Sequence, residues 1–244
     1  AKAAQIGAVE IPFHEPGMAE LLAKHLDTGR FAVEPAPDDA IRKADVLFVC
    51  VGTPQKEDGS ADLMYLDQVT RAIASNLNGY KLIVEKSTAP VLTAQRIGES
   101  IGRYSRREGG SSEFDVAVNP EFLREGTAIE DSLGPDRIVL GVGSARARDI
   151  LLAIYQPLLD RMGATVESRV LVTSVATAEI IKHASNAFLA ARISMINMVA
   201  DLCDATGADI GDVARGVGMD RRMGPHMLNA GIGFGGSCFP KDIR

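Results

Sequence analysis

Residues 45–53 read Asp-Val-Leu-Phe-Val-Cys-Val-Gly-Thr and lead into Pro54, so an apolar run of strand length ends in a turn. An unbroken apolar run is typical of a strand buried on both faces of a parallel sheet. Further strands are predicted at residues 81–85, 114–119, 137–142 and 164–167. Helices are predicted at 15–28, 63–77 (capped by Asp62), 92–101 and 145–159, with Pro157 expected to end or kink the last one. Strands that alternate with helices predict an α/β fold on a parallel sheet.

Three polar residues each follow a predicted strand directly. They are Thr53, Thr88 and Glu121. Ligands of such sheets bind beyond the carboxyl ends of the strands. We therefore expect these three side chains to converge on one rim of the sheet.

The pattern changes near residue 170. Residues 177–206 contain neither glycine nor proline, which predicts a helix of roughly thirty residues. The helix is apolar on most faces, and such a helix is usually buried. We expect it to be buried against a second copy in a homodimer, with a domain boundary near 168 that gives domains 1–168 and 169–244.

The amino-acid composition disfavours several classes of protein. The net charge of −6 disfavours a general nucleic-acid binder. The three cysteines are far apart and lack metal-ligand spacing, so they are predicted to be reduced thiols in a cytoplasmic protein, with no metal site. No apolar run is long enough to span a bilayer, and the amino terminus has no signal peptide and no initiator Met.

A glycine-rich run, Gly231-Ile-Gly-Phe-Gly-Gly-Ser, leads into Cys238-Phe-Pro-Lys-Asp242. Glycines let backbone amides approach a ligand closely, and a thiol beside a cation is a candidate nucleophile. The run also matches G-x-G-x-x-G literally, a fingerprint that needs a strand before it and a helix after it. Met227-Leu228-Asn229-Ala230 precedes the run and Pro240 follows closely, so the match is interpreted as accidental. The other thiols, Cys50 and Cys203, are expected to be small buried hydrophobic residues.

Lys182 and Asn186 are four residues apart on the predicted long helix and share a face, with Glu179 on the same side. Taken alone, they predict either a catalytic pair or an ordinary polar cluster. A Cys-His-Asn hydrolase built from Cys238, His183 and Asn186 is disfavoured, because such triads take their residues from separate elements. Glu121 and Glu125 would face one way if their segment were helical.

Five segments, in their order and spacing, resemble the UDP-glucose/GDP-mannose dehydrogenase family. They are Val51-Gly-Thr-Pro54, Lys86-Ser-Thr-Ala-Pro90, Asn119-Pro-Glu-Phe-Leu-Arg-Glu-Gly126, Glu179-Ile-Ile-Lys-His-Ala-Ser-Asn186 and Gly233-Phe-Gly-Gly-Ser-Cys-Phe-Pro-Lys-Asp242. The resemblance covers nearly the whole chain and is closer to the UDP-glucose branch than to the GDP-mannose branch. It implies a Rossmann-like NAD-binding domain followed by an all-helical domain for substrate and dimerisation. It also implies oxidation of a nucleotide sugar's primary alcohol to a carboxylate, with two NAD⁺ and no metal.

The resemblance also assigns roles to residues. Cys238 would add to the aldehyde and then carry a thioester that water hydrolyses. Lys182 and Asn186 would stabilise the negative charge of the reacting oxygen. The residues that would position water and handle protons are Thr88, Glu121 and Asp242. Those that would line the cofactor are Val51, Thr53, Pro54, Ser87, Thr88, Glu125, Cys238 and Lys241. Those that would hold the UDP-sugar are Glu121, Phe122, Leu123, Lys182, Asn186, Arg222, Asn229, Gly233, Phe234 and Gly235, with Arg222 expected to reach into the partner subunit's site.

The chain departs from the family pattern at both ends. The family's first βαβ unit would precede residue 1 and its C-terminal nucleotide-binding domain would follow Arg244, so an internal fragment is expected. Three alternatives stay open. They are the same chemistry on GDP-mannose or UDP-N-acetylmannosamine, a noncatalytic nucleotide-binding module, and a hydroxyacid dehydrogenase of the 6-phosphogluconate type, which would need no thiol.

Overall fold

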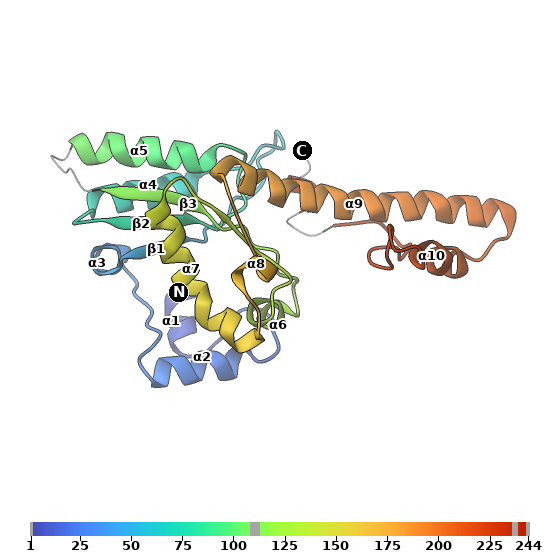
Figure 1. Cartoon of the computed structure of the whole chain (residues 1–244), viewed down its shortest axis with the longest axis horizontal. Helices are drawn as coiled ribbons and strands as arrows, with labels where there is room; N and C mark the ends of the chain where they lie inside the picture. Colours follow the sequence, from blue (N-terminus) through green and yellow to red (C-terminus); the bar gives the residue numbers. More distant parts are fainter. Residues whose placement is uncertain (1, 108–112, 236–238, 243–244) are drawn as a thin grey trace. The chain divides into compact units, whose positions relative to one another are not determined.

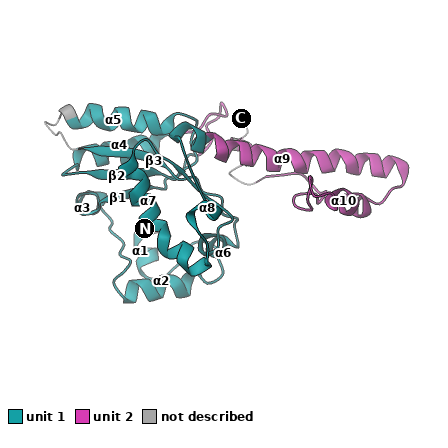
Figure 2. Ribbon diagram, viewed as in Figure 1, with its two compact units in different colours: residues 1–53, 63–179 teal, residues 54–62, 180–244 magenta. Residues whose placement is uncertain are grey.

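The computed structural model describes residues 2–107, 113–235 and 239–242 of the chain. It divides into two compact units, which Figure 2 shows in separate colours. The first unit comprises residues 1–53 and 63–179, and the second comprises residues 54–62 and 180–244.

The first unit is built on a five-stranded sheet in the order β1-β2-β3-β4-β5. Its strands are β1 (Val46–Val49), β2 (Lys81–Glu85), β3 (Phe114–Val118), β4 (Ile138–Gly141) and β5 (Val170–Thr173). Neighbouring strands are parallel except β3 and β4, which meet antiparallel at a single residue pair. The predicted α/β fold is therefore confirmed, with one antiparallel junction in the sheet.

The last residues of all five strands lie in one row. Successive Cα partners across the sheet are Val49, Glu85, Val118, Gly141 and Thr173. We call this row the strand-end rim. Every segment that leaves a strand at its carboxyl end therefore starts from the same line.

Helices cover both faces of the sheet (Figure 1). On one face, α3 (Pro37–Lys43), α4 (Met64–Ser75) and α5 (Thr93–Arg107) pack around Ile83 of β2. On the other, α7 (Ala145–Met162) packs against Leu82 and Val84. Alternate residues of a strand point to opposite faces, so Glu85 lies on the α4 and α5 side. The remaining helices of this unit are α1 (Lys2–Gly7), α2 (Met18–Asp27), α6 (Ala128–Leu133) and α8 (Val166–Arg169).

The second unit is mainly helical. Helix α9 (Val175–Thr206) begins in the first unit and continues through the second, the division falling between Glu179 and Ile180. Helices α10 (Ile210–Gly218) and α11 (Phe239–Asp242) follow. Residues 54–62 form a small hairpin, in which Gln55 and Ala61 pair as an antiparallel bridge.

One predicted strand and one predicted helix end are wrong, whereas the alternative of a kink at Pro157 stays a prediction. Residues 164–167 are not a strand, because Thr165 caps α8 through a reciprocal capping box with Ser168, and the strand comes only afterwards at Val170–Thr173. Helix α7 does not end at Pro157 but continues to Met162 and stops at Gly163, whose φ is 62°. Proline leaves the carbonyl of Ala153 without its helical donor, and both residues are exposed, so water can satisfy that group.

Burial also corrects two expectations. The long helix is confirmed, but within this chain it exposes an apolar stripe, with Phe188 at 75%, Met195 at 62% and Leu202 at 65% exposure. Cys50 is exposed at the end of β1, whereas Cys203 is buried as predicted.

Helix boundaries also differ from the predictions. Helix α4 has Leu63 rather than Asp62 at its N-cap position, and α5 continues to Arg107, beyond the predicted end at residue 101. Among the described residues, no helix combines the length and hydropathy needed to cross a membrane.

Candidate functional site

Hydrogen bonds connect the segment that follows β1 to the segment that follows β2. The Thr53 hydroxyl donates to the Thr88 carbonyl at 2.6 Å, and the Ser87 hydroxyl donates to the Val51 carbonyl at 2.8 Å. The backbone amides of Lys86 and Ser87 both donate to the carbonyl of Val49, the last residue of β1. The structure thus brings together four of the predicted cofactor residues, Val51, Thr53, Ser87 and Thr88. Pro54, the next in sequence, belongs to the second unit.

Asn119 connects the end of β3 to its neighbours, and it is only 2% exposed. Its backbone amide donates to the Glu85 carbonyl at 2.9 Å, and its side-chain amide donates to the Val139 carbonyl at 3.0 Å. Its side-chain oxygen accepts from Lys86 at 3.2 Å and from the Tyr155 hydroxyl. Sequence reasoning quoted Asn119 only as part of a motif, and its strand-end position was the signal that it organises the strand-end rim.

The segment after β3 carries Glu121, Phe122, Leu123 and Glu125 in non-helical backbone, so Glu121 and Glu125 do not share a helix face. Glu121 accepts from the backbone amide of Leu123, and the Arg137 guanidinium lies 4.0 Å from the centre of the Phe122 ring. Arg124 is tied to Asp131 by its backbone amide at 2.8 Å and by its guanidinium. The hydrogen bond from Arg124 lowers the pKa of Asp131 to about 2. These contacts hold the segment close to helix α6, with Leu123 and Glu125 exposed.

On helix α9, Lys182 and Asn186 are both buried, at 8% and 5% exposure. The Asn186 side-chain amide donates to the Asp242 carboxylate at 2.6 Å, and a ring nitrogen of His183 lies 3.4 Å from the Asp242 carbonyl oxygen. Asp242 is itself buried at 9% exposure. The predicted catalytic residues Asn186 and Asp242 are therefore in direct contact, although they are far apart in sequence.

Two carboxyl groups interact electrostatically near the strand-end rim, those of Glu85 and Glu179, and sequence reasoning missed the first of them. Glu85 ends β2, is 2% exposed, and receives no hydrogen bond from any described residue on either carboxyl oxygen. Burial, and then the charge of Glu179, raise the pKa of Glu85 to about 8. Glu179 accepts from the backbone amides of Leu92 at 2.8 Å and Ala94 at 3.0 Å, where α5 begins. These two amides belong to the amino terminus of a helix, a position where the helix dipole favours acidic side chains.

The other predicted substrate residues of the second unit, apart from Lys182 and Asn186 on α9, lie between α10 and α11. Arg222 is exposed and is bound to Asp220, whose carboxylate accepts from the Arg222 backbone amide at 2.9 Å and from its guanidinium. Gly233 has a φ of 113°, a conformation that glycine adopts without strain. Phe234 packs edge-on against Phe239, with 6.0 Å between ring centres. Asn229 and Gly235 are exposed.

The candidate residues are divided between the two units. Glu121 and the four residues that follow β1 and β2 at the rim, Thr88 among them, belong to the first unit. Lys182, Asn186, Asp242 and the residues from Arg222 to Gly235 belong to the second. Cys238 and the Lys241 side chain lie outside the described residues. Within the described part of the chain, no group of three or more His, Cys, Asp or Glu residues is arranged to hold a metal ion.

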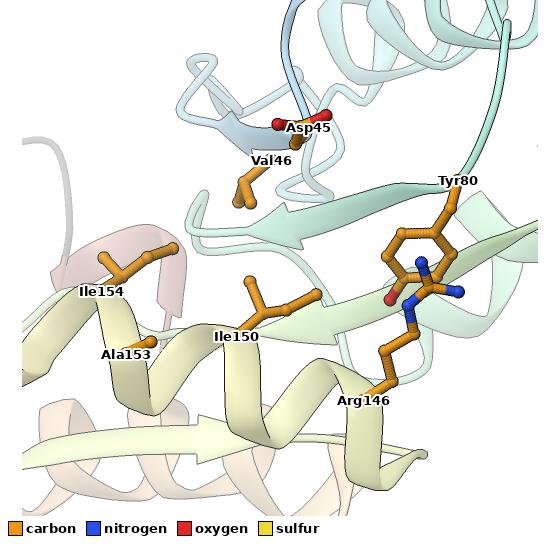
Figure 3. A pocket seen from close by; sticks show the side chains of 7 residues that line it. All are labelled: Asp45, Val46, Tyr80, Arg146, Ile150, Ala153 and Ile154. Carbon is orange, nitrogen blue, oxygen red and sulfur yellow. The ribbon is translucent and has the colours of Figure 1, made fainter.

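A cavity of about 630 Å³ lies at the opposite ends of the strands (Figure 3). Asp45 and Val46 line it at the start of β1, Tyr80 just before β2, and Arg146 and Ile150 from α7. The Arg146 guanidinium lies 3.3 Å from the centre of the Tyr80 ring. The Tyr80 hydroxyl donates to Asp115 at 2.8 Å, and burial together with this carboxylate raises the pKa of Tyr80 to about 12. None of the predicted site residues lines this cavity.

Comparison with known proteins identifies the family. Residues 1–159 match the NAD binding domain of the UDP-glucose/GDP-mannose dehydrogenase family, and residues 176–244 match its central domain. The chain therefore belongs to the UDP-glucose/GDP-mannose dehydrogenase family.

Individual relatives share both sequence and fold with the chain. It is 45% identical to the UDP-glucose 6-dehydrogenase of Rhizobium meliloti over 236 residues, which is 96% of this chain and 52% of that protein. The solved UDP-glucose dehydrogenase of Pyrobaculum islandicum superposes with a TM-score of 0.89 at 41% identity, over 98% of this chain and 54% of the other. The solved GDP-mannose dehydrogenase of Pseudomonas aeruginosa superposes with a TM-score of 0.83 at 31% identity, over 99% of this chain and 55% of the other. The chain spans about half the length of the relatives it matches.

Proposed function

We propose that the intact protein is an NAD-dependent UDP-glucose 6-dehydrogenase, which oxidises the primary alcohol of UDP-glucose to a carboxylate. The observation that carries the proposal is the 45% identity to a UDP-glucose 6-dehydrogenase across 96% of this chain. One alcohol, two NAD⁺ and one water give one carboxylate, two NADH and three protons.

The chain's own residues supply the covalent chemistry. The Cys238 thiolate adds to the aldehyde carbon left by the first oxidation, and after the second oxidation the sulfur is held as a thioester. Water attacks the thioester carbon, the carbon–sulfur bond breaks, and the thiolate returns. A thiol suits both steps because it is a good nucleophile and a good leaving group.

Lys182 and Asn186 stabilise the negative charge that develops on the reacting oxygen. Both are buried, and electrostatic stabilisation is strongest where water is excluded. The contact between Asn186 and Asp242 fixes the orientation of the Asn186 amide and places an acceptor for protons beside it. Thr88 and Glu121, which follow β2 and β3, position the attacking water.

NAD, when bound, accepts the hydride. The segments after β1 and β2 fit a dinucleotide, since they start at the carboxyl ends of parallel strands and are held rigidly by the bonds from Thr53 and Ser87. We infer that Val51, Thr53, Pro54, Ser87 and Thr88 line the cofactor. Glu125, Cys238 and Lys241 would complete this set on its nicotinamide side.

The nucleotide sugar is held by backbone-rich segments. Phe122 and Leu123 offer backbone groups after β3, together with the carboxylate of Glu121. Asn229, Gly233, Phe234 and Gly235 offer an exposed turn in which glycine permits close approach. Lys182 and Asn186 contact the sugar at its reacting oxygen. The exposed guanidinium of Arg222 is available to a second subunit.

We infer that the protein is a homodimer through α9. Phe188, Met195 and Leu202 recur every seven residues, and Met198 lies beside them on the same face. The exposed stripe is about 21 Å long at 1.5 Å per residue. A continuous apolar stripe of this kind on a charged protein is typical of an interface between chains. In this proposal residues 169–244 are the substrate and dimerisation domain, and residues 1–168 are the NAD-binding domain.

The outer edge of β1 also has a proposed role. Among the described residues β1 pairs only with β2, and the cavity in Figure 3 opens beside its first residues. An unpaired edge exposes backbone donors and acceptors, so further strands are expected to pair there. We infer that the family's opening βαβ unit occupies this edge.

The decisive experiment measures NADH released per sugar by the intact protein. Two NADH per UDP-glucose support the proposal. Turnover of only GDP-mannose or UDP-N-acetylmannosamine would contradict the substrate, and no turnover of any of the three would favour a noncatalytic nucleotide-binding module. Cys238→Ser tests the thioester route: full activity in this variant excludes it, and would favour a thiol-independent dehydrogenase.

A further inference from the structure

Helix α9 holds the chain that follows α10 at separate points in the second unit. The Arg192 guanidinium donates to the Met223 carbonyl at 2.7 Å and to the Gly224 carbonyl at 2.9 Å. Five residues further along α9, the Asn197 side-chain oxygen accepts from the backbone amide of Gly231 at 2.8 Å. Both side chains therefore bind backbone groups, so the contacts depend on the path of the chain and not on which side chains it carries.

The path between these two contacts is tightly constrained. Gly224 has a φ of 65°, and Met227 has a φ of 58°, which is unusual for a residue with a side chain. A Cβ on Gly218 would lie 3.0 Å from the Cα of Pro225, so α10 ends against this segment. Leu228 is 7% exposed. A strained conformation persists only where its surroundings fix it, and here Arg192, Asn197 and the buried Leu228 do so.

A third contact from α9 lies near the end of the described chain. Asn186 holds Asp242, and Asn197 holds Gly231. These two asparagines are eleven residues apart, which is about three helical turns, so they lie on one face of α9. The same helix face therefore binds residue 231 and residue 242.

We propose that Arg192 and Asn197 are positioning residues that hold residues 223–231 in the conformation that binds the nucleotide sugar. The proposal rests on the proposed function for the sugar-binding residues: Asn229 lies between the two contacts in sequence, and Gly233 to Gly235 follow them. A loop that is ordered before the ligand arrives does not lose conformational entropy on binding, so affinity is gained without any contact from Arg192 or Asn197 to the ligand. Specificity for the sugar then depends on α9 as well as on the residues that touch it.

The test uses matched variants of the intact protein. Arg192→Met removes both carbonyl contacts, and Arg192→Lys keeps a cation. Asn197→Leu removes the acceptor, and Asn197→Asp keeps an acceptor oxygen. Ser194→Ala, at an exposed position between them on α9, is the control. Steady-state kinetics with UDP-glucose and hydrogen exchange of residues 223–231 are measured for each.

We expect Arg192→Met and Asn197→Leu each to raise KM for UDP-glucose about tenfold, because each variant loses one or two hydrogen bonds, while kcat changes by less than about twofold. Amide exchange in residues 223–231 becomes faster. Asn197→Asp restores KM and exchange, Arg192→Lys restores them in part, and Ser194→Ala matches the wild type.

Two outcomes would overturn the proposal. If Arg192→Met and Asn197→Leu both kept the wild-type KM and the wild-type rate of amide exchange, the contacts would not position residues 223–231. A fall in kcat and thermal stability without rescue by Asn197→Asp would show a purely structural role. If the wild-type protein does not oxidise UDP-glucose, the proposed function fails instead, and the exchange data still decide whether Arg192 and Asn197 hold the segment.

Discussion

The side-chain amide of Asn186 donates a hydrogen bond to the carboxylate of Asp242, with 2.6 Å between Nδ2 and Oδ2. Both residues are buried, so water competes little for this contact. A charge-assisted hydrogen bond in such a place is strong and fixes the direction of both groups. In the proposed mechanism, Asn186 therefore acts through its orientation as well as its polarity.

Asn186→Ala should lower kcat by about 10²-fold, because it removes a donor from the reacting oxygen and leaves Asp242 without this partner. Asn186→Asp places two carboxylates side by side, and such a pair cannot ionise fully. Residual activity of Asn186→Asp should therefore rise at lower pH. Initial rates across pH 5–9 measure this. Ser185→Ala, whose hydroxyl donates to the Ile181 carbonyl within α9, is the control. A flat pH profile for Asn186→Asp would contradict the proposed proximity.

Glu85 makes stability depend on pH. Its pKa is about 8 in the native state and its ordinary value is 4.5. Between these values the native state binds more protons than the unfolded state, so stability is greatest at or below pH 4.5 and falls as pH rises towards 8. The contribution of this group is about 1.4 kcal/mol per pH unit in that window. Glu85→Gln should remove this slope and leave a more stable protein at pH 8.

Urea unfolding of the wild type, of Glu85→Gln and of the exposed control Glu57→Gln at several pH values between 5 and 9 tests this directly. Parallel curves for the wild type and Glu85→Gln would show that Glu85 does not titrate in this range.

Glu179 should affect both the stability of the protein and the titration of Glu85. Glu179→Gln weakens the two hydrogen bonds to Leu92 and Ala94 at the start of α5, which should cost about 1–3 kcal/mol of unfolding free energy. It also removes the negative charge near Glu85, so the pKa of Glu85 should move down towards its ordinary value. The pH at which stability stops falling should therefore be lower in this variant. An unchanged profile would mean that the two carboxyl groups do not interact.

Gly141 has no room for a methyl group. A Cβ there would lie 2.6 Å from the Ala178 Cβ and 3.0 Å from the Val175 Cα, in the first turn of α9. Gly141→Ala should therefore destabilise the protein by about 1–3 kcal/mol. Gly143→Ala, two residues later, meets nothing within 4 Å and should be nearly neutral. Thermal unfolding of the two variants compares them, and equal melting temperatures would contradict the close packing.

The apolar stripe on α9 predicts the oligomeric state. Met198→Lys places a charge on that stripe and should shift the protein from dimer to monomer in sedimentation equilibrium, since a buried unpaired charge is costly. Met64→Lys changes a comparably exposed methionine on α4 and should leave the assembly unchanged. A wild-type monomer, or a dimer that survives Met198→Lys, would rule out this interface.

Local sequence pattern predicted those parts of the fold in which one signal dominates. The strands β1, β2 and β4 and the long helix α9 were predicted from their apolar composition. Burial follows that composition fully in β2 and β4, but β1, expected to be buried on both faces, exposes Phe48, and α9 exposes its apolar stripe. The pattern failed at residues 164–167, because a side-chain cap at Thr165 outweighed an apolar composition typical of strands. It failed again at Pro157, because a proline on an exposed helix face costs less than one inside a core.

The site was predicted where the chemistry of a residue is visible in the sequence. Lys182, Asn186 and Asp242 are polar residues in distinctive motifs, and the structure shows all three to be buried. Glu85 was missed because a charged residue at the end of a strand usually points to solvent, and only the packing of α4 and α5 over that face shows its burial. Arg192 and Asn197 were missed for a related reason, since their partners are backbone groups distant in sequence.

The strand-end rim has a consequence for how ligand binding would affect the stability of the sheet. Val49, Glu85, Val118, Gly141 and Thr173 come from all five strands, yet they lie in one row. A ligand that binds only the native state raises the cost of opening every element that it touches. Binding at this row would therefore slow amide exchange in strands that span well over a hundred residues of sequence, and would turn a local contact into cooperativity across the sheet.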